Sequence, residues 1–433
     1  MLDYRAVQKV RGTYGIGIRR RLDATNRIHP VPTFKPSTQR QSYQAPNIQN
    51  VISDKGGEES LAAGFRRCIV ARKDCRLIEI DYRGIEAMQV GWFSRDPNYI
   101  RLAKLGVHAA LASHVLKRPY DPAWPDADLV EYFQEIKDTE ELVYSQTKTV
   151  VHGVSYGRTP HGMHRDYPEL FPTLASATRT FDTFYEMAPM IPKWHADIRG
   201  FVDTHGYLGG IGEPPFGHPY HYRHYYYGVF TYSRLTVTQM MRLKAKYAKL
   251  GRPAPVVDVN GIHYKQINGE DAKRLVAFPP QSTAAANLKE AELLLFGDPT
   301  AHHYIGNAYD GQTCLRAPIH DSLLLEVPLT EEERVLTAVA TIMPRPILEQ
   351  PLPAEWGMGE YLNIGVEAKA SAPGGDWGSM EKIDLPIVST PSLAADRAYT
   401  PIDDGETDEW DEWMDLGRAM GHLPTDASSP ASS

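Results

Sequence analysis

The stretch LRAPIHDSLLLEV, residues 315–327, is the part of the chain that most clearly indicates a fold. Two apolar runs typical of buried β-strands flank His320 and Asp321, which predicts a hairpin with a charged residue at its turn. Burying an ionised carboxylate costs several kcal/mol unless an opposite charge or a cation accompanies it. The rest of the sequence should therefore supply a partner for Asp321.

The composition is that of an ordinary soluble protein. The chain has 433 residues, enough for two or three domains, with 42% hydrophobic and 23% charged residues. No run of about 18 apolar residues occurs, so we expect no membrane span, and the start lacks the apolar core of a secretory signal. Its three cysteines are too few for a disulfide framework and lack the paired spacing of a zinc site. A reducing cytosol is the expected location.

The acidic charge is concentrated at the C-terminal end. Residues 401–433 contain nine acidic residues and one basic residue, so they account for the whole net charge of −8. Residues 1–400 are neutral overall and contain basic clusters such as RGTYGIGIRRRL, residues 11–22. Because local field matters more than total charge, nucleic-acid binding remains open.

A second carboxylate follows a second predicted strand. The segment CRLIEIDYRG predicts a strand that ends at Asp81, and IEAMQVGWFS after it predicts a helix. If this strand lies beside the 315–327 hairpin, Asp81 and Asp321 could share divalent cations, which would offset the cost of burying them. The alternative for either residue is a simple cap of a helix or a turn, and the residues alone leave both open.

Residues 97–205 are predicted to be mostly helical, and one segment there carries a distinctive stripe. In YSQTKTVVHGVSYGRTPHG, the residues Lys148, His152 and Tyr156 follow i, i+4, i+8 spacing, so they line one helix face. A cation, an imidazole and a phenol on one face suit a triphosphate and a base, and Gly153 and Gly157 beside them would leave room for a flat partner. An ordinary amphipathic surface helix is the alternative.

Five motifs, taken together and in this order, resemble the family A DNA polymerases, the relatives of bacterial DNA polymerase I. The resemblance covers roughly residues 1–382. The motifs are RQSYQAPNIQNV (40–51), DYRGIE (81–86), KTVVHGVSYG (148–157), FPPQSTAAANLKEAEL (278–293) and IHDSLLLEV (319–327).

The resemblance implies an α+β right-hand polymerase fold, with an antiparallel palm sheet carrying both aspartates, a helical fingers domain, and most of the thumb absent. The implied division is as follows: residues 1–25, a remnant of the last thumb helix; 26–96, the first part of the palm; 97–270, the fingers, with the nucleotide-binding helix near 144–157; 271–385, the second part of the palm; and 386–433, an acidic disordered tail.

The resemblance also implies the chemistry, template-directed addition of deoxynucleotides to a primer 3′-hydroxyl. Asp81 and Asp321 would ligate two Mg²⁺ ions together with the backbone carbonyl of Tyr82, and would form the catalytic set with Lys148. One ion would lower the pKa of the primer hydroxyl, and the other would neutralise the triphosphate.

The remaining implied roles concern nucleotide and DNA. Lys148 would contact the phosphates, Glu86 would be a steric gate against ribonucleotides, and His152 and Tyr156 would contact the nucleotide, as would Tyr82. Primed template DNA would be held near the primer terminus, where minor-groove acceptors are nearly independent of sequence. The residues implied for that contact are Arg40, Asn47, Gln49, Gln281 and His320.

The sequence departs from the family pattern at several positions. Tyr144 stands where the family has an arginine that grips the triphosphate, His152 replaces an aromatic ring, Ser322 replaces an acid, and Gly84 replaces a glutamine. We expect activity with weakened nucleotide affinity. Of the family's thumb, only the last helix has a counterpart in this sequence, which suggests that a separate chain carries the thumb and the exonuclease. By analogy with the family, we expect the protein to be phage-encoded and to work in the cytosol of a bacterium.

Other functions remain as alternatives. A catalytically inactive polymerase-like subunit could bind primed DNA or assemble a replisome, and a metal-dependent nuclease also uses paired carboxylates. In GHPYHYRHYYYG, the three-residue spacing of His218, His221 and His224 suggests a possible zinc site, although an aromatic loop near DNA is the favoured interpretation. The basic segment 240–255 is either a solvated helix face or a phosphate-contacting surface.

Overall fold

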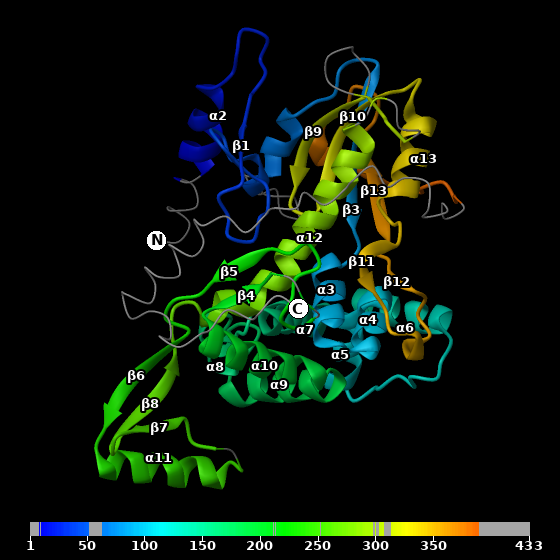
Figure 1. Cartoon of the computed structure of the whole chain (residues 1–433). Helices are drawn as coiled ribbons and strands as arrows, with labels where there is room; N and C mark the ends of the chain where they lie inside the picture. Colours follow the sequence, from blue (N-terminus) through cyan, green and yellow to red (C-terminus); the bar gives the residue numbers. More distant parts are fainter. Residues whose placement is uncertain are drawn as a thin grey trace. The chain divides into compact units, whose positions relative to one another are not determined.

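The computed structural model describes residues 8, 10–51 and 63–388, apart from 211, 213, 252, 298, 300–302 and 307–312. Two compact units make up the chain. The first unit combines residues through Gln89 with those from Gln281 onward, and the second contains Val90–Pro280. The chain passes from one unit to the other within two helices, α3 (Ile85–Ser94) and α12 (Ala272–Phe296) (Figure 1).

A five-stranded antiparallel sheet forms the centre of the first unit, in the order β14-β13-β3-β10-β9. Its strands are β3 (Cys75–Tyr82), β9 (Cys314–Ile319), β10 (Ser322–Pro328), β13 (Val366–Ala370) and β14 (Glu381–Ile383). This confirms the predicted hairpin of residues 315–327, the predicted strand ending near Asp81, and the antiparallel sheet that carries both aspartates.

The apolar run of β10 explains its central position. Leu323, Leu325 and Val327 are fully buried, as are Ile78 and Ile80 on the neighbouring strand β3. Burying each such side chain contributes roughly 1.5–3 kcal/mol, so the central pair of strands holds a large share of the unit's stability. The strand ends that bear Asp81 and Asp321 are therefore rigidly placed.

Shorter elements complete the first unit. They are the π-helix η1 (Val10–Ile16), α2 (Gly17–Arg19), the paired strands β1 (Val31–Thr33) and β2 (Ser42–Gln44), η2 (Ile48–Asn50), η3 (Ala63–Cys68), α13 (Glu332–Ile342), the paired strands β11 (Ile347–Pro351) and β12 (Tyr361–Leu362), η4 (Ala354–Trp356) and η5 (Trp377–Ser379). From residue 389 on, the predicted acidic tail lies outside the described residues. No helix in the described ranges is long and apolar enough to cross a membrane.

Helices dominate the second unit, as predicted for residues 97–205. They are α4 (Pro97–Leu105), α5 (Val107–Val115), α6 (Asp126–Thr139), α7 (Glu141–Ser155), α8 (Pro160–Asp166), α9 (Leu174–Met187) and α10 (Met190–His205). Helices α5, α7 and α9 pack against one another, and Phe181, Phe184 and Trp194 are buried in this unit. Because α7 is packed on one side, its other side can present functional side chains.

The aromatic segment after α10 belongs to the core of the second unit. Strands β4 (Tyr207–Gly209) and β5 (Arg223–Tyr225) pair here, and His218 is only 1% exposed, with its ring near those of Phe93, Tyr222 and Phe278. Burial lowers the pKa of His218 to about 3, which keeps the imidazole neutral. Within the described ranges no cluster of three or more His, Cys, Asp or Glu side chains suits a metal ion, so the zinc alternative has no support.

The last part of the second unit before α12 is a small sheet with one helix. It consists of β6 (Phe230–Leu235), α11 (Val237–Lys249), β7 (Val256–Val259) and β8 (Ile262–Asn268), with strand order β6-β8-β7. The motif FPPQSTAAANLKEAEL (278–293) lies within α12, which begins at Ala272 and includes Pro279 and Pro280 in its interior.

Candidate functional site

The hairpin turn places Asp321 beside the end of β3. Ser322 pairs with Asp81 in the antiparallel register, and the backbone N–H of Tyr82 donates to the carbonyl of Asp321 at 3.4 Å. His320 and Asp321 form the two-residue turn, in which His320 has a φ of 58°. Positive φ is uncommon for a residue other than glycine, and such strain is frequently found at functional sites.

The pKa of Asp81 is raised to about 7. Burial is the largest cause, and the negative charges of Asp321 and Glu79 add to it. Asp81 also lies opposite Glu367 in the register of β13 with β3. The ends of three neighbouring strands therefore gather carboxylates where little water screens them, an arrangement that a bound cation would stabilise.

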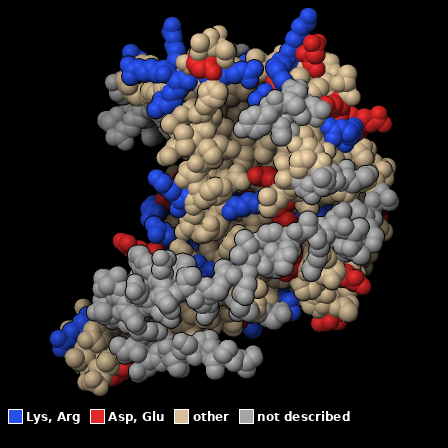
Figure 2. Space-filling model, turned by 45° about the horizontal axis from the view of Figure 1, so that its top comes forward, with Lys and Arg blue, Asp and Glu red and all other residues tan. Residues whose placement is uncertain are grey.

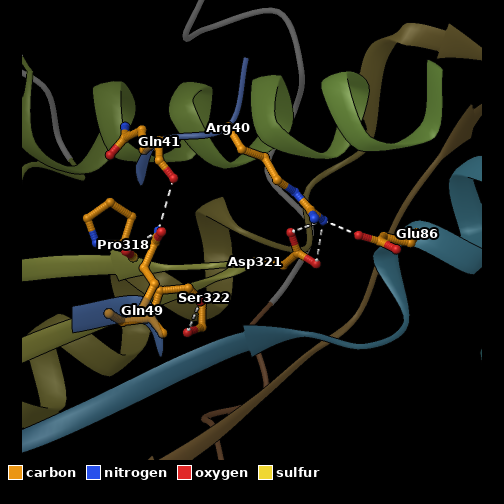
Figure 3. Close-up of polar contacts among 8 residues, drawn as sticks. Arg40, Gln41, Gln49, Glu86, Pro318, Asp321 and Ser322 are labelled. Carbon is orange, nitrogen blue, oxygen red and sulfur yellow. Dashed lines mark hydrogen bonds and ion pairs between the residues drawn. The ribbon is translucent and has the colours of Figure 1, made fainter. Parts of the chain in front are cut away.

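Arg40 lies between two carboxylates of this group (Figure 3). Its Nη2 is 3.0 Å from Oδ1 of Asp321 and also forms an ion pair with Glu86. The three side chains are only 20–22% exposed, so the interactions are weakly screened. Burial acts to lower the pKa of the guanidinium, but the two carboxylates outweigh it and raise that pKa. For Glu86, burial raises the pKa of the carboxyl, and the positive charge of Arg40 opposes this effect.

Other residues predicted to contact DNA lie near the same turn. The Gln49 side chain donates to the carbonyl of Gln41 at 3.0 Å and to that of Pro318 at 3.3 Å, which ties the 40–51 segment to β9 (Figure 3). The His320 ring lies 3.1 Å from the carbonyl of Gln49, and the Asn47 side chain accepts from the backbone N–H of Gln49. The structure thus brings Arg40, Asn47, Gln49 and His320 together around Asp321. Gln281 is half-buried on α12.

Glu79 is a charged residue at this site that sequence reasoning missed. It lies two residues before Asp81 on β3, and the Ser322 hydroxyl donates to it at 3.3 Å. The indole of Trp377 donates to its other oxygen at 2.7 Å, and Arg66 stacks on that indole at 4.0 Å. The signal was present in the sequence, because alternate strand residues share a face. An acid in place of Ser322 would lie beside the Glu79 carboxylate and repel it.

The predicted stripe on α7 has the expected geometry within the second unit. Lys148 and His152 are exposed, while Val150, Val151 and Val154 on the opposite side are buried. Tyr156 is the C-cap residue of α7 and is half-buried. The stripe is therefore amphipathic, as its spacing predicted, and its last member lies at the helix end rather than within the helix.

A second histidine that the sequence interpretation missed supports this stripe. The ring of His108 on α5 lies 5.2 Å from that of His152 and 6.0 Å from that of Tyr144. Burial is the largest cause, with the nearby His152 and Lys148 adding to it, of a pKa of His108 lowered to about 3. His108 is therefore neutral and supports the imidazole of His152. In sequence it was hidden in the apolar run VHAALASHV.

The two glycines of this segment serve packing within the chain, contrary to the expectation of room for a flat partner. A Cβ on Gly153 would lie 2.0 Å from the end of the Met163 side chain, and one on Gly157 would lie 3.2 Å from Val276. Gly157 has a φ of 64°, the left-handed conformation that ends α7. Arg158, considered as a replacement for the missing arginine, pairs instead with Asp166 at 3.4 Å.

The donor atoms at the strand ends fit a hard divalent cation. Carboxylate and carbonyl oxygens are what Mg²⁺ prefers, and Asp81, Asp321 and the backbone of Tyr82 meet there. The raised pKa of Asp81 reflects first its burial and then the nearby negative charges of Asp321 and Glu79, both of which a bound cation would offset. No cluster of three or more His, Cys, Asp or Glu side chains suits a metal ion among the described residues, so a cation at this pair would need further oxygen ligands from outside the chain.

Comparison with known proteins gives a consistent result. Residues 1–212 match the model described as DNA polymerase family A. DNA polymerase I of Deinococcus radiodurans is 26% identical over 369 residues, which cover 83% of this chain and 31% of the relative. DNA polymerase I of Lactococcus lactis subsp. lactis is 23% identical over 371 residues, which cover 83% of this chain and 34% of the relative. The chain thus spans about a third of the length of these relatives.

A solved structure shares the fold. The polymerase domain of Pol1 from M. smegmatis, in complex with DNA primer-template and dNTP, has a TM-score of 0.57 and 17% sequence identity. The match covers 88% of this chain and 53% of that chain. It confirms the predicted fold class, a mixed helical and antiparallel-sheet polymerase architecture.

Proposed function

We propose that this chain is a family A, template-directed DNA polymerase that adds deoxynucleotides to a primer 3′-hydroxyl. The observation that carries the proposal is the meeting of Asp81 and Asp321 at adjacent strand ends, with the pKa of Asp81 raised to about 7. A pair of buried carboxylates without a cation is costly, and polymerase chemistry requires such a pair.

Asp81, Asp321 and the backbone carbonyl of Tyr82 would hold two Mg²⁺ ions. When bound, these ions lower the pKa of the primer hydroxyl and neutralise charge on the triphosphate. The contribution of the chain is placement, because the buried apolar residues of β3 and β10 fix the strand ends at which the two carboxylates lie. Arg40 would turn from Asp321 to the minor groove of the primer terminus once cations and DNA enter.

Glu86 would select the sugar of the nucleotide. It stands at the start of α3, and Arg40 holds it in place. A carboxylate fixed at this point would crowd a 2′-hydroxyl while leaving room for the hydrogen of a deoxyribose. Lys148 on α7 would contact the phosphates as a point charge, and His152 and Tyr156 would contact the nucleotide.

The rival proposal, an inactive polymerase-like subunit that binds primed DNA or assembles a replisome, rests on Tyr144 and Ser322. Both residues make local contacts that an arginine and an acid would not. Tyr144 packs edge-on against His108, and Ser322 donates to the carbonyl of Ile319 at 2.8 Å. The close placement of Asp81 and Asp321 favours the active enzyme, because an inactive scaffold has no need of two neighbouring, largely buried carboxylates.

Primer extension tests these functions. The full chain is incubated with primed template and Mg²⁺, with either dNTPs or rNTPs, beside Asp321→Asn and the matched surface variant Asp138→Asn on α6. We expect extension by the wild type and by Asp138→Asn with dNTPs only, and none by Asp321→Asn. Glu86→Ala should accept rNTPs. Tight binding of primed DNA with no extension at any Mg²⁺ concentration, alone or with candidate partner chains, would favour the inactive subunit.

The separate thumb and exonuclease chain stays a prediction, as do the phage source and the bacterial cytosol. Co-purification with the tagged chain from its source cells tests the first. Processive synthesis by the chain alone, with no partner recovered, would contradict it.

A further inference from the structure

The segment formed by β6, α11, β7 and β8, called here the basic module (residues 229–268), lies beyond residues 1–212, the part that matches the family model. Strong local signals specify it. Thr236 and Gln239 form a capping box at the start of α11, and Asn260 and Gly261, with φ of 52° and 76°, form the turn between β7 and β8. Figure 1 shows α11 lying along the three-stranded sheet.

The charge of the basic module differs from that of the chain. The module contains seven lysine or arginine residues and a single acidic residue, Asp258, in a chain whose net charge is −8. Asp258 is itself 2.8 Å from His263. The module is therefore strongly cationic, although the net charge of the chain conceals this.

Helix α11 separates its apolar and basic residues. Met240 is buried and Leu243 and Tyr247 are half-buried, so this side faces the sheet. Arg242, Lys244, Lys246 and Lys249 are all exposed, and none of the four forms an ion pair with another described residue. At the lower left of Figure 2, where the module lies, blue side chains line its outer edge.

We infer that the basic module binds the phosphate backbone of duplex DNA, as a grip additional to the carboxylate site. Arg242 and Lys249 are seven residues apart, or about 10 Å along the helix, and duplex DNA presents one negative charge per about 1.7 Å. One face of α11 therefore spans several phosphates. Arg242, Lys246 and Lys249 lie within about 60° of one another around the helix, because each residue turns it by about 100°, and α11 contains no acidic residue.

The side chains of α11 favour duplex over single-stranded DNA, although the module also carries Tyr232 on β6, which is 49% exposed. The exposed apolar residues of α11 are the aliphatic Val237 and Met241, which are 58% and 63% exposed, whereas the one aromatic residue of the helix, Tyr247, is turned toward the sheet. Proteins that hold single strands usually combine a basic groove with aromatic rings on which bases stack. This inference rests on the proposed function only in taking DNA as the partner, because backbone binding needs no nucleotide transfer.

The test removes four charges in the module and four elsewhere. Variant one carries Arg242→Gln, Lys244→Gln, Lys246→Gln and Lys249→Gln, and the control carries Lys73→Gln, Lys137→Gln, Lys193→Gln and Lys382→Gln, all exposed lysines outside the module. Binding of labelled blunt duplex, single-stranded DNA and primer-template is measured by anisotropy at several salt concentrations. Thermal melts confirm folding, and Lys246→Gln with Lys249→Gln serves as a milder variant.

We expect variant one to bind duplex at least about 10-fold more weakly than the control, with the slope of log K against log salt smaller by about two to four, since each phosphate contact contributes about 0.9. This inference is read out by duplex binding without nucleotides and the polymerase proposal by primer extension, so module-dependent duplex binding without extension would contradict only the polymerase proposal. Equal duplex affinity for variant one and the control would overturn the inference. So would a loss confined to single-stranded DNA.

Discussion

The carboxylate group of the first unit and the α7 stripe of the second unit are assembled in opposite ways. Asp81 and Asp321 are far apart in sequence and meet only because β10 pairs with β3. Lys148 and His152 are four residues apart and share a face because α7 is a helix. The first group is half-buried and its charges interact strongly, whereas the second is exposed and its charges are screened by water. Substitutions in the first group should therefore have larger effects.

The largest effect is expected from the strand-end carboxylates. Asp81→Asn and Asp321→Asn should each reduce primer extension by at least about 10³-fold, because several kcal/mol of transition-state charge stabilisation depend on the pair. The double variant should be hardly worse than either single one, since the two residues act as a unit. Single-turnover rates with preformed primer-template measure this. Additive losses would show that the two carboxylates work independently.

A smaller effect is expected from the α7 stripe. Lys148→Ala should lower kcat/KM for dNTP by about 10- to 100-fold, since a charge-assisted contact contributes about 1.5–3 kcal/mol. Leu142→Ala, an exposed change on the same helix, is the control and should leave kcat/KM unchanged. Steady-state kinetics at saturating primed DNA gives kcat/KM for dNTP for both variants. If Lys148→Ala lost as much activity as Asp321→Asn, the exposed and buried groups would not differ as proposed.

The pH dependence of stability should follow Asp81. The pKa of its carboxyl is about 7 in the folded chain and near its ordinary value of 3.8 when unfolded, so the folded state binds the extra proton between these limits. Stability should therefore fall as pH rises through this window, by about 2 kcal/mol between pH 5 and 6.5. The free energy of unfolding is measured with denaturant at each pH in the presence of a chelator. Asp81→Asn is the reference, and its free energy of unfolding should not change with pH in this window. An identical pH profile for the two proteins would refute this electrostatic account.

The smallest effect is expected at the end of α7. Gly157 has a φ of 64°, so Gly157→Ala should lower the free energy of unfolding by about 1 kcal/mol. Gly200→Ala on α10, where a Cβ meets no atom within 4 Å, should be neutral or slightly stabilising. Thermal melts of both variants test this. If only Gly200→Ala were destabilised, the prediction that Gly157 requires a glycine would be wrong.

Local patterns predicted the elements well because their causes are local. The apolar run of β10 and the i, i+4 spacing on α7 each depend on residues a few positions apart, so the strand and the helix stripe could be predicted from the sequence. Long-range contacts could not be read in this way. The ion pairs of Arg40 with Asp321 and Glu86, and the support that His108 gives His152, bring together segments that no local period relates.

By itself, the sequence determined that Asp321 lies at a hairpin turn, that Lys148 and His152 share a helix face, and which family the motifs resemble. Only the tertiary structure decided that Arg40 lies between two carboxylates, that Glu79 occupies the space beside Ser322, and that His218 is buried. The reason is physical. The hydrogen bonds of helices and turns join residues a few positions apart, so local residue patterns can predict them. Burial and charge–charge interactions depend instead on which distant segments pack together.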